Sequence, residues 1–151
     1  GDRVFRAAWE RSLKGHLPKL QLCHKAIKTE KAFTLIGKKL EKEYKKLGFK
    51  YSRKNKFLKK STKKFDYYIF FSLFFENIPG EYLELHVTLM IADRALLKTN
   101  KYLNCEVFRM NLWEMDNHYN IANEALINDT FIDLNNKINE YLIPHIKRLE
   151  I

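Results

Sequence analysis

The feature that most constrains the fold of this chain is a pair of alternating segments that flank residues 77–80. In the first segment, six apolar or aromatic side chains occupy every second position from Phe65 to Phe75, and in the second, five do so from Leu83 to Ile91. A period of two is that of a β-strand, whose successive side chains point to opposite faces of the sheet. The Asn-Ile-Pro-Gly sequence between the segments is typical of a turn. The chain is therefore predicted to contain a long antiparallel hairpin with one fully apolar face.

The second face of this hairpin is only partly polar. Its return strand presents polar side chains, among them His86, which we interpret as an ordinary histidine of a sheet surface. Its first strand presents Tyr68, Phe70 and Phe74 instead. Because a contiguous apolar patch on a protein surface commonly marks an interaction site, either another element covers these rings or they contact a partner. Tyr68, Phe70 and Phe74 are our candidate residues for partner or homodimer contact.

A helix and a short strand pair are predicted before the hairpin. Apolar side chains step by three or four positions from Phe33 to Leu47, which is the spacing of one face of an α-helix. Thr29 is a candidate N-cap of this helix, and Gly48 follows it where a left-handed C-cap residue is expected. Residues 49–57 then change to a period of two, which predicts two short strands joined by a turn.

Further strands and a helix are predicted after the hairpin. Residues 105–113 alternate as a strand does, and residues 118–121 predict one more short strand, whereas residues 93–104 fit either a short helix or a loop. A final helix is predicted to begin at Thr130, because the spacing to an aspartate three residues later matches a capping box. Pro144 removes a backbone donor, so a kink or break is expected there.

This order of elements predicts an α+β fold, with N-terminal helices, an antiparallel β-meander of about four to five strands, and a C-terminal helix packed on the sheet. A length of 151 residues suits a single domain. An amphipathic helix is also predicted over residues 4–13, before the helix breakers Gly15 and Pro18. Residues 1–25 therefore either belong to the domain or form a separate helical arm.

Composition and hydropathy argue against several classes of protein. The longest uncharged run, Tyr67–Phe75, spans nine residues, which is about half the length that a membrane-spanning helix requires. The charged residues Asp2, Arg3 and Arg6 stand where a signal peptide would have its apolar segment. Two cysteines are too few for a disulfide framework. We therefore expect a cytoplasmic protein that does not contact a membrane.

The sequence carries no recognisable catalytic or cofactor-binding motif. It lacks the glycine-rich patterns that bind phosphates or dinucleotides. His16, Cys23 and His24 would offer three metal ligands, and a zinc site of four ligands would need the distant Cys105 as well. Cys23 and His24 are neighbours in the sequence, but adjacent side chains usually point apart, and no local signature marks a cysteine nucleophile with a histidine base. We therefore expect neither enzymatic activity nor a bound metal or cofactor.

Positive charge is concentrated in one segment of the chain. The net charge is +10, and residues 38–64 alone hold 13 Lys or Arg against two acidic residues, whereas residues 65–151 hold seven basic and 13 acidic residues. This asymmetry favours association with a polyanion or an acidic protein, although lysines on a solvated surface need no partner. The candidate lysines for such attraction are Lys54, Lys56, Lys59 and Lys60.

Aromatic residues interleave with these lysines, which leaves nucleic acid as an alternative partner. Lysines neutralise phosphates and aromatic rings stack on bases, as they do in single-strand binding grooves. Phe65 and Tyr67, however, fall on the face that is predicted for the core, and arginine, whose planar group reads bases, is scarce in the segment. Binding of nucleic acid by residues 38–64 would therefore depend on salt and tolerate many sequences.

The order of several features resembles that of a known family. The features are the Leu-Gly-Phe-Lys step at 47–50, the aromatic Phe57, the long aromatic strand, the return strand Leu-His-Val-Thr-Leu at 85–89 and the closing Leu-Ile-Pro at 142–144. Over roughly residues 33–149, the chain resembles a bacterial family of small α+β domains of unknown function, some relatives of which are immunity proteins of polymorphic toxin systems. The resemblance implies a binding domain rather than an enzyme and supplies no catalytic residues.

Together, the residues and the resemblance lead us to expect a non-enzymatic binding protein. Its most fitting partner is an acidic protein, to which it would bind as an immunity protein or inhibitor does. The aromatic side chains would anchor that partner, and the lysines would raise the rate of association. A homodimer formed through the same aromatic side is an alternative outcome.

Overall fold

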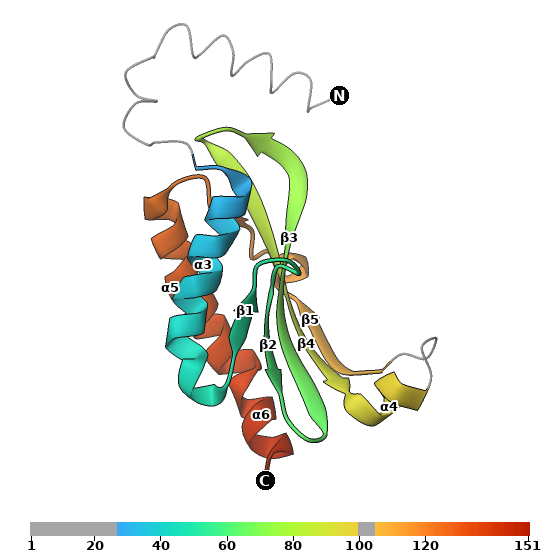
Figure 1. Cartoon of the computed structure of the whole chain (residues 1–151). Helices are drawn as coiled ribbons and strands as arrows, with labels where there is room; N and C mark the ends of the chain where they lie inside the picture. The colour runs from blue at the N-terminus through green and yellow to red at the C-terminus, as the bar shows by residue number, and fades with distance from the viewer. Residues whose placement is uncertain (1–26, 100–104) are drawn as a thin grey trace, which may run out of the picture.

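A computed structural model of the chain describes residues 27–99 and 105–151 (Figure 1). The helix predicted over residues 4–13 lies outside these ranges. In chain order, the elements are α3 (Thr29–Tyr44), the 3₁₀ turn η1 (Lys45–Leu47), β1 (Lys50–Ser52), β2 (Phe57–Ser61), β3 (Phe65–Ile78), β4 (Tyr82–Asp93), α4 (Arg94–Thr99), β5 (Glu106–Asn111), the 3₁₀ turn η2 (Leu112–Met115), β6 (Tyr119–Asn120), α5 (Glu124–Tyr141) and α6 (Ile143–Leu149).

The strands form one six-stranded antiparallel sheet. Their order is β1-β2-β3-β4-β5, and β6 pairs with the part of β4 that β5 does not reach. The predicted hairpin is β3 with β4, whose register runs from Phe65 opposite Asp93 to Ile78 opposite Tyr82. The α+β prediction is confirmed. The sheet has more strands than the four to five predicted, because the short segments expected at residues 49–57 and 118–121 all pair into it, as β1, β2 and β6.

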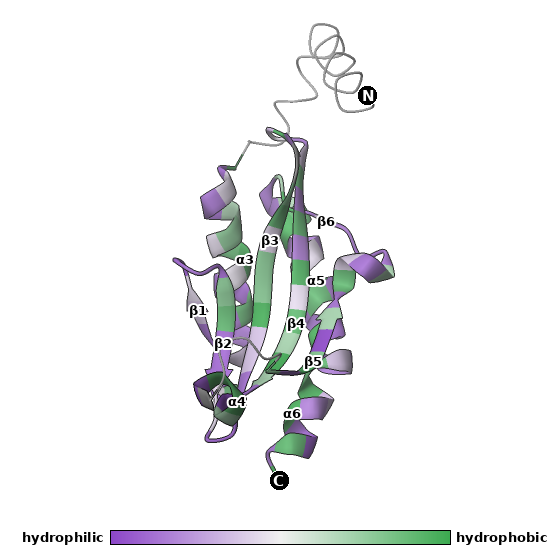
Figure 2. Ribbon diagram, turned by 90° about the vertical axis from the view of Figure 1, so that its right-hand side faces the viewer, coloured by the Kyte–Doolittle hydropathy of each residue, from purple (hydrophilic) through white to green (hydrophobic). Residues whose placement is uncertain are grey.

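The helices α3, α5 and α6 pack on one face of this sheet (Figure 1). That face carries every second residue of β3 and β4, as the alternation requires, and Tyr67, Ile69, Leu85 and Leu89 are fully buried there. Among the described elements, no α-helix covers the middle of the opposite face, which points toward the viewer in Figure 2. The sheet therefore has a covered face and an open face, and we use these two names below.

Helix α3 buries the stripe that predicted it, and two details at its ends differ from the prediction. Lys28 precedes the helix as N-cap without a side-chain bond, so Thr29 is the first helical residue rather than the cap. Gly48 has the expected left-handed conformation, with a φ of 94°. Leu47 is 40% exposed, because the chain tightens into the 3₁₀ turn η1 and rotates this side chain off the stripe.

The N-terminus of the last long helix is not where it was predicted. Helix α5 begins at Glu124, and the side chain of Asn123 accepts a hydrogen bond from the backbone of Leu126 at 3.0 Å. The predicted start at Thr130 is wrong, because Thr130 is buried inside the helix and Asp133 accepts a hydrogen bond from the Tyr119 hydroxyl at 2.6 Å. The break before Pro144 is confirmed, since α5 ends at Tyr141 and α6 starts at Ile143.

Candidate functional site

The open face is built by the side chains of five strands that point away from α3, α5 and α6. The register places them in rows across the sheet. One row runs Lys50, Lys59, Tyr68, Met90 and Arg109, and the next runs Ser52, Phe57, Phe70, Thr88 and Asn111. The third row is shorter and consists of Ser72 on β3 opposite His86 on β4. The face is thus a mixture of aromatic, cationic and uncharged polar side chains.

Three half-buried rings form an aromatic cluster at the centre of the open face, made of Phe57, Tyr68 and Phe70. The rings of Tyr68 and Phe70 stack with centroids 4.8 Å apart and planes at 16°. Phe57, from the neighbouring strand β2, meets both rings edge-on, at 5.3 Å and 5.4 Å. The structure therefore places Tyr68 and Phe70 side by side on the open face, together with Phe57, which the sequence analysis did not select for this surface.

Phe74, the third aromatic candidate, lies apart from this cluster. Its ring centroid is 5.3 Å from that of His86, whose ring in turn stacks on Trp113 with centroids 5.1 Å apart and planes at 15°. Trp113 belongs to η2, the turn that leads from β5 toward β6. The open face consequently has two aromatic regions, one at Tyr68 and one at His86.

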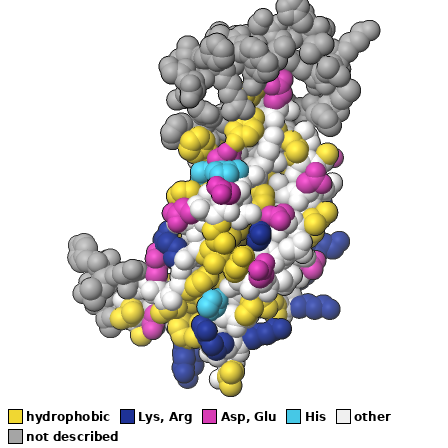
Figure 3. All heavy atoms as spheres, turned by 180° about the vertical axis from the view of Figure 1, so that it is seen from behind, with side chains coloured by type: hydrophobic (Ala, Val, Ile, Leu, Met, Phe, Trp, Pro, Cys, Tyr) yellow, Lys and Arg dark blue, Asp and Glu magenta, His cyan; other side chains and the backbone are white. Residues whose placement is uncertain are grey.

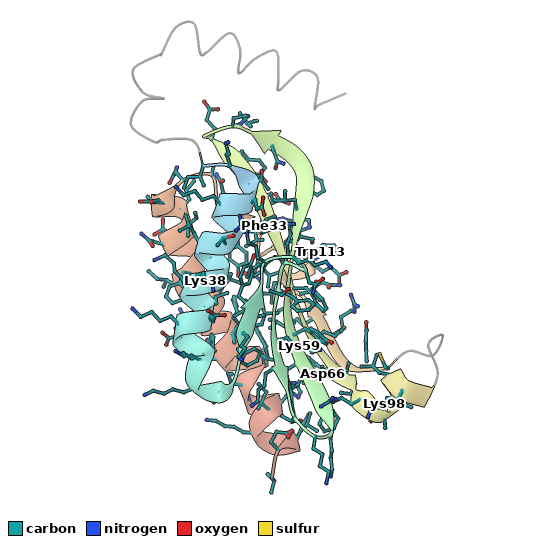
Figure 4. The ribbon with its side chains drawn as sticks, viewed as in Figure 1. Phe33, Lys38, Lys59, Asp66, Lys98 and Trp113 are labelled. Carbon is teal, nitrogen blue, oxygen red and sulfur yellow. The ribbon has the colours of Figure 1, made fainter. Side chains whose placement is uncertain are left out.

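The four candidate lysines diverge. The ammonium group of Lys59 lies 5.5 Å from the ring centroid of Tyr68, on the open face. That of Lys56 lies 6.0 Å from the ring of Phe33. Phe33, which is labelled in Figure 4, is a buried residue of α3. Lys60 donates a hydrogen bond to the backbone carbonyl of Leu47 at the end of η1. Lys54 is exposed in the turn between β1 and β2, so Lys59 is the one candidate of the four that the register places on the open face.

Lys59 and Arg109 lie in a network of opposite charges. Asp66 is nearly buried, and its carboxylate lies 3.9 Å from the ammonium of Lys59 and 3.7 Å from Nε of Arg94. On β5, Nε of Arg109 lies 2.9 Å from both carboxylate oxygens of Glu106. The hydrogen bonds from Arg109 hold the pKa of Glu106 below its ordinary value. The cationic groups of the open face are therefore positioned by acidic neighbours rather than gathered into one basic patch.

A second group, which we call the histidine–carboxylate cluster, consists of Glu84, His86 and His118. Nε2 of His86 lies 2.5 Å from Oε2 of Glu84, and Nδ1 of His118 lies 3.4 Å from the same oxygen. The hydroxyl of Tyr82 donates to the other oxygen. Burial by itself would raise the pKa of Glu84, but the hydrogen bonds from Tyr82, His86 and His118 outweigh it and lower that pKa.

Strand pairing brings this cluster together, which the sequence analysis did not foresee. Glu84 and His86 share one face of β4 because they are two residues apart. His118 joins them because it precedes β6, whose Tyr119 pairs with Leu85. A usable signal was present, since Glu-x-His in a strand always places both side chains on one face. The residues at 16, 23 and 24, which the sequence analysis considered as metal ligands and did not favour, lie outside the described residues.

Comparison with known proteins adds no relative. No family model, no curated protein sequence and no solved structure matches the chain. The resemblance to domains related to immunity proteins therefore stays a prediction. Within the described ranges, no helix has both the length and the apolar character to cross a membrane.

Proposed function

We propose that this protein binds an acidic protein partner through the open face of its sheet. The observation that carries the proposal is a sheet surface whose middle none of the described helices covers, with the aromatic cluster at its centre and Lys59 beside it. Aromatic side chains in the middle of an interface supply most of the binding energy, while charged groups at its edge steer the encounter. In this view the cluster anchors the partner, as the binding of an immunity protein or inhibitor to its target would require.

The geometry of the rings favours a protein over nucleic acid as the partner. A base needs an accessible ring face on which to stack. Tyr68 and Phe70 stack on each other, and the ammonium of Lys59 lies over the ring of Tyr68. Phe57 contacts both rings through its edge. The cluster therefore offers a packed apolar surface, which suits the side chains of a protein better than it suits separate bases.

The directions of the lysines support the same choice. A nucleic-acid backbone is neutralised by cations that follow its path. Lys56 and Lys60 instead lie against Phe33 and the Leu47 carbonyl. The excess charge of residues 38–64 then acts mainly at long range, where a net positive field raises the association rate with an acidic partner. Nucleic acid and a second copy of this chain remain as the competing outcomes of the test.

The test combines capture of a partner with matched surface variants. The immobilised full chain is used to recover partners from extract, and each recovered protein is purified and titrated by calorimetry at low and high salt. We expect an acidic protein whose dissociation constant rises about 30-fold with Phe70→Ser, the size of an interface hot spot. Lys59→Glu should weaken binding about tenfold, with the larger loss at low salt.

Two controls lie away from the open face. Ile132 on α5 is an apolar residue that is 60% exposed, and Lys31 on α3 is an exposed lysine. Ile132→Ser and Lys31→Glu should leave the dissociation constant unchanged. Equal effects of control and open-face variants, recovery of nucleic acid alone, or a homodimer that binds no acidic protein would each contradict the proposed function.

A further inference from the structure

We propose that Glu84, His86 and His118 bind one divalent transition-metal ion of the zinc class. This site is separate from the aromatic cluster and goes beyond the binding function proposed above. Two imidazoles and one carboxylate form a ligand set that zinc uses in proteins, with a fourth position left for water or another ligand. Hard cations such as Mg²⁺ and Ca²⁺ prefer sets made of oxygen alone, so imidazole ligands favour the zinc class.

The ligand atoms are already close to the spacing that such an ion requires. One nitrogen or oxygen from each of the three side chains lies within 4.8 Å of the others. At bond lengths of about 2.1 Å, two ligands of a tetrahedral zinc ion are roughly 3.4 Å apart. Nδ1 of His118 and Oε2 of Glu84 are separated by 3.4 Å. Nε2 of His86 is nearer to that oxygen, at 2.5 Å, and this pair opens when the ion replaces the hydrogen bond between them.

The surroundings hold the ligands in place. The ring of His86 is stacked on Trp113 and is in contact with Phe74 on another side. Tyr82 donates a hydrogen bond to the second oxygen of Glu84, which fixes the plane of the carboxylate. Such outer contacts orient metal ligands and commonly change metal affinity by about 10- to 100-fold. The cluster is therefore preorganised on β4, where Glu84 is only 6% exposed.

One side of the cluster is accessible from solvent. The side chain of His118 is 49% exposed, whereas those of His86 and Glu84 are 13% and 8% exposed. Figure 3 shows histidine and acidic side chains next to each other at the surface. An ion can thus enter from the side of His118, bind the buried carboxylate and keep one coordination position open. The competing explanation is a hydrogen-bonded cluster that only joins β6 to β4.

The experiment measures metal binding by the full chain with Zn²⁺ and Co²⁺ as probes. Metal-free protein is titrated with Zn²⁺ in equilibrium dialysis, and Co²⁺ binding is followed by quenching of Trp113 fluorescence. The chain has two tryptophans, so all fluorescence variants also carry Trp9→Phe. We expect Co²⁺ to quench Trp113, because this indole stacks on a ligand ring. Zn²⁺ should reverse the quenching by displacing Co²⁺.

Three variants decide between the explanations. His118→Ala and Glu84→Gln should each weaken Zn²⁺ and Co²⁺ binding by at least about 100-fold. His145→Ala is the matched control, because this histidine contacts Phe108 and Arg148 elsewhere in the structure, and it should leave the affinity unchanged. His118→Ala replaces the most exposed ligand, and an unchanged circular-dichroism spectrum would show that the variant folds.

The outcomes are exclusive. Loss of Trp113 quenching in His118→Ala and Glu84→Gln but not in His145→Ala would establish the site. If Co²⁺ did not quench Trp113 in the protein that carries Trp9→Phe alone, the proposal would be overturned. Equal Zn²⁺ affinity of the His118→Ala variant and the parent would overturn it as well, because the metal would then be bound by other residues.

Discussion

The two faces of the sheet place neighbouring residues of the same strands in different surroundings. On β3, Tyr67 and Phe71 point to the covered face and are buried under the helices, whereas Tyr68 and Phe70 point to the open face and are half-buried. The residue types are the same in both pairs. What differs is the layer above them, so coverage by helices, rather than hydrophobicity, separates the fully buried rings from those that stay partly exposed.

The contrast is just as clear for polar groups. On the covered side, the Tyr67 hydroxyl donates to Glu150 at 2.9 Å, a contact within the molecule. On the open side, polar groups of several strands meet near solvent, as in the histidine–carboxylate cluster and the pair of Arg109 with Glu106. The Tyr67 hydroxyl is thus tied into the fold, whereas the open face brings polar groups of several strands together and places the exposed His118 beside the buried Glu84.

The largest effect is expected from truncating one phenylalanine on each face. Phe71→Ala should lower the free energy of unfolding by about 3–5 kcal/mol, the usual cost of a cavity at a buried phenylalanine. Phe70→Ala should lower it by only about 1 kcal/mol, since its ring is half-buried. Urea denaturation of both variants measures the difference. Equal losses would mean that the open face is as much a part of the core as the covered face.

A smaller loss of stability is expected from a substitution at Gly37, where α3 meets β1 on the covered side. A Cβ added to Gly37 would lie 2.4 Å from Cε1 of Tyr51, closer than real side-chain contacts allow. Gly37→Ala should therefore cost about 1–3 kcal/mol through overpacking, in spite of the higher helix propensity of alanine. Thermal unfolding checks this value. A gain in stability would show that α3 and β1 are not in the close contact described.

The N-cap of α5 should contribute about as much to the free energy of unfolding as one hydrogen bond does. Asn123→Ala removes the acceptor of the Leu126 amide, and the usual cost of losing such a cap is about 1 kcal/mol. Asn123→Asp keeps an acceptor and should stay within a few tenths of a kcal/mol of the parent. Chemical denaturation of both variants separates the cap from other effects of the substitution. An Asp variant as unstable as the Ala variant would contradict the assigned cap.

The smallest effect is expected in how the free energy of unfolding depends on pH. It is compared for one carboxylate on the covered side of the sheet and one on the open face. Glu41 accepts a hydrogen bond from the backbone of Tyr51 at 2.7 Å, which lowers its pKa from 4.5, and Arg109 lowers that of Glu106 from the same value. Because the folded pKa is below the unfolded one, each group stabilises the fold above about pH 4.5, and that stabilisation disappears as the pH falls through the folded pKa.

Glu41→Gln and Glu106→Gln should each reduce the dependence of the free energy of unfolding on pH below about pH 4.5. Both variants should approach the parent protein in stability at the lowest pH at which the fold persists. Denaturation at several pH values measures this slope. If the free energy of unfolding of Glu41→Gln depended on pH as that of the parent does, the hydrogen bond between Glu41 of α3 and Tyr51 of β1 would not stabilise the fold as described.

Much of the fold could be predicted because the alternation in β3 and β4 is long. The apolar positions from Phe65 to Ile91 fixed both the hairpin and its buried face, and the same pattern placed Tyr68 and Phe70 on the other side. The start of α5 could not be predicted well, because Thr130 has a capping spacing that its burial inside the helix overrides. Local capping signals lose to tertiary packing in such cases.

The candidate site was predicted less completely than the fold. The four lysines were grouped by their nearness in the sequence, yet Lys59 and Lys60 are adjacent in β2 and must point to opposite faces. The histidine–carboxylate cluster depends on the pairing of β4 with the two-residue strand β6. The sequence predicts a short strand at residues 118–121 but not the strand with which it pairs, and only the pairing shows that His118 lies beside Glu84.

The most direct test of the open face as the contact surface is hydroxyl-radical footprinting of the free protein and of its complex with the proposed acidic partner. The account predicts that oxidation of Tyr68 and Phe70 falls several-fold in the complex, while that of the exposed Ile132 on α5 stays the same. Protection of Ile132 with unchanged oxidation of Tyr68 and Phe70 would contradict it, because the partner would then cover the helices and leave the open face in solvent.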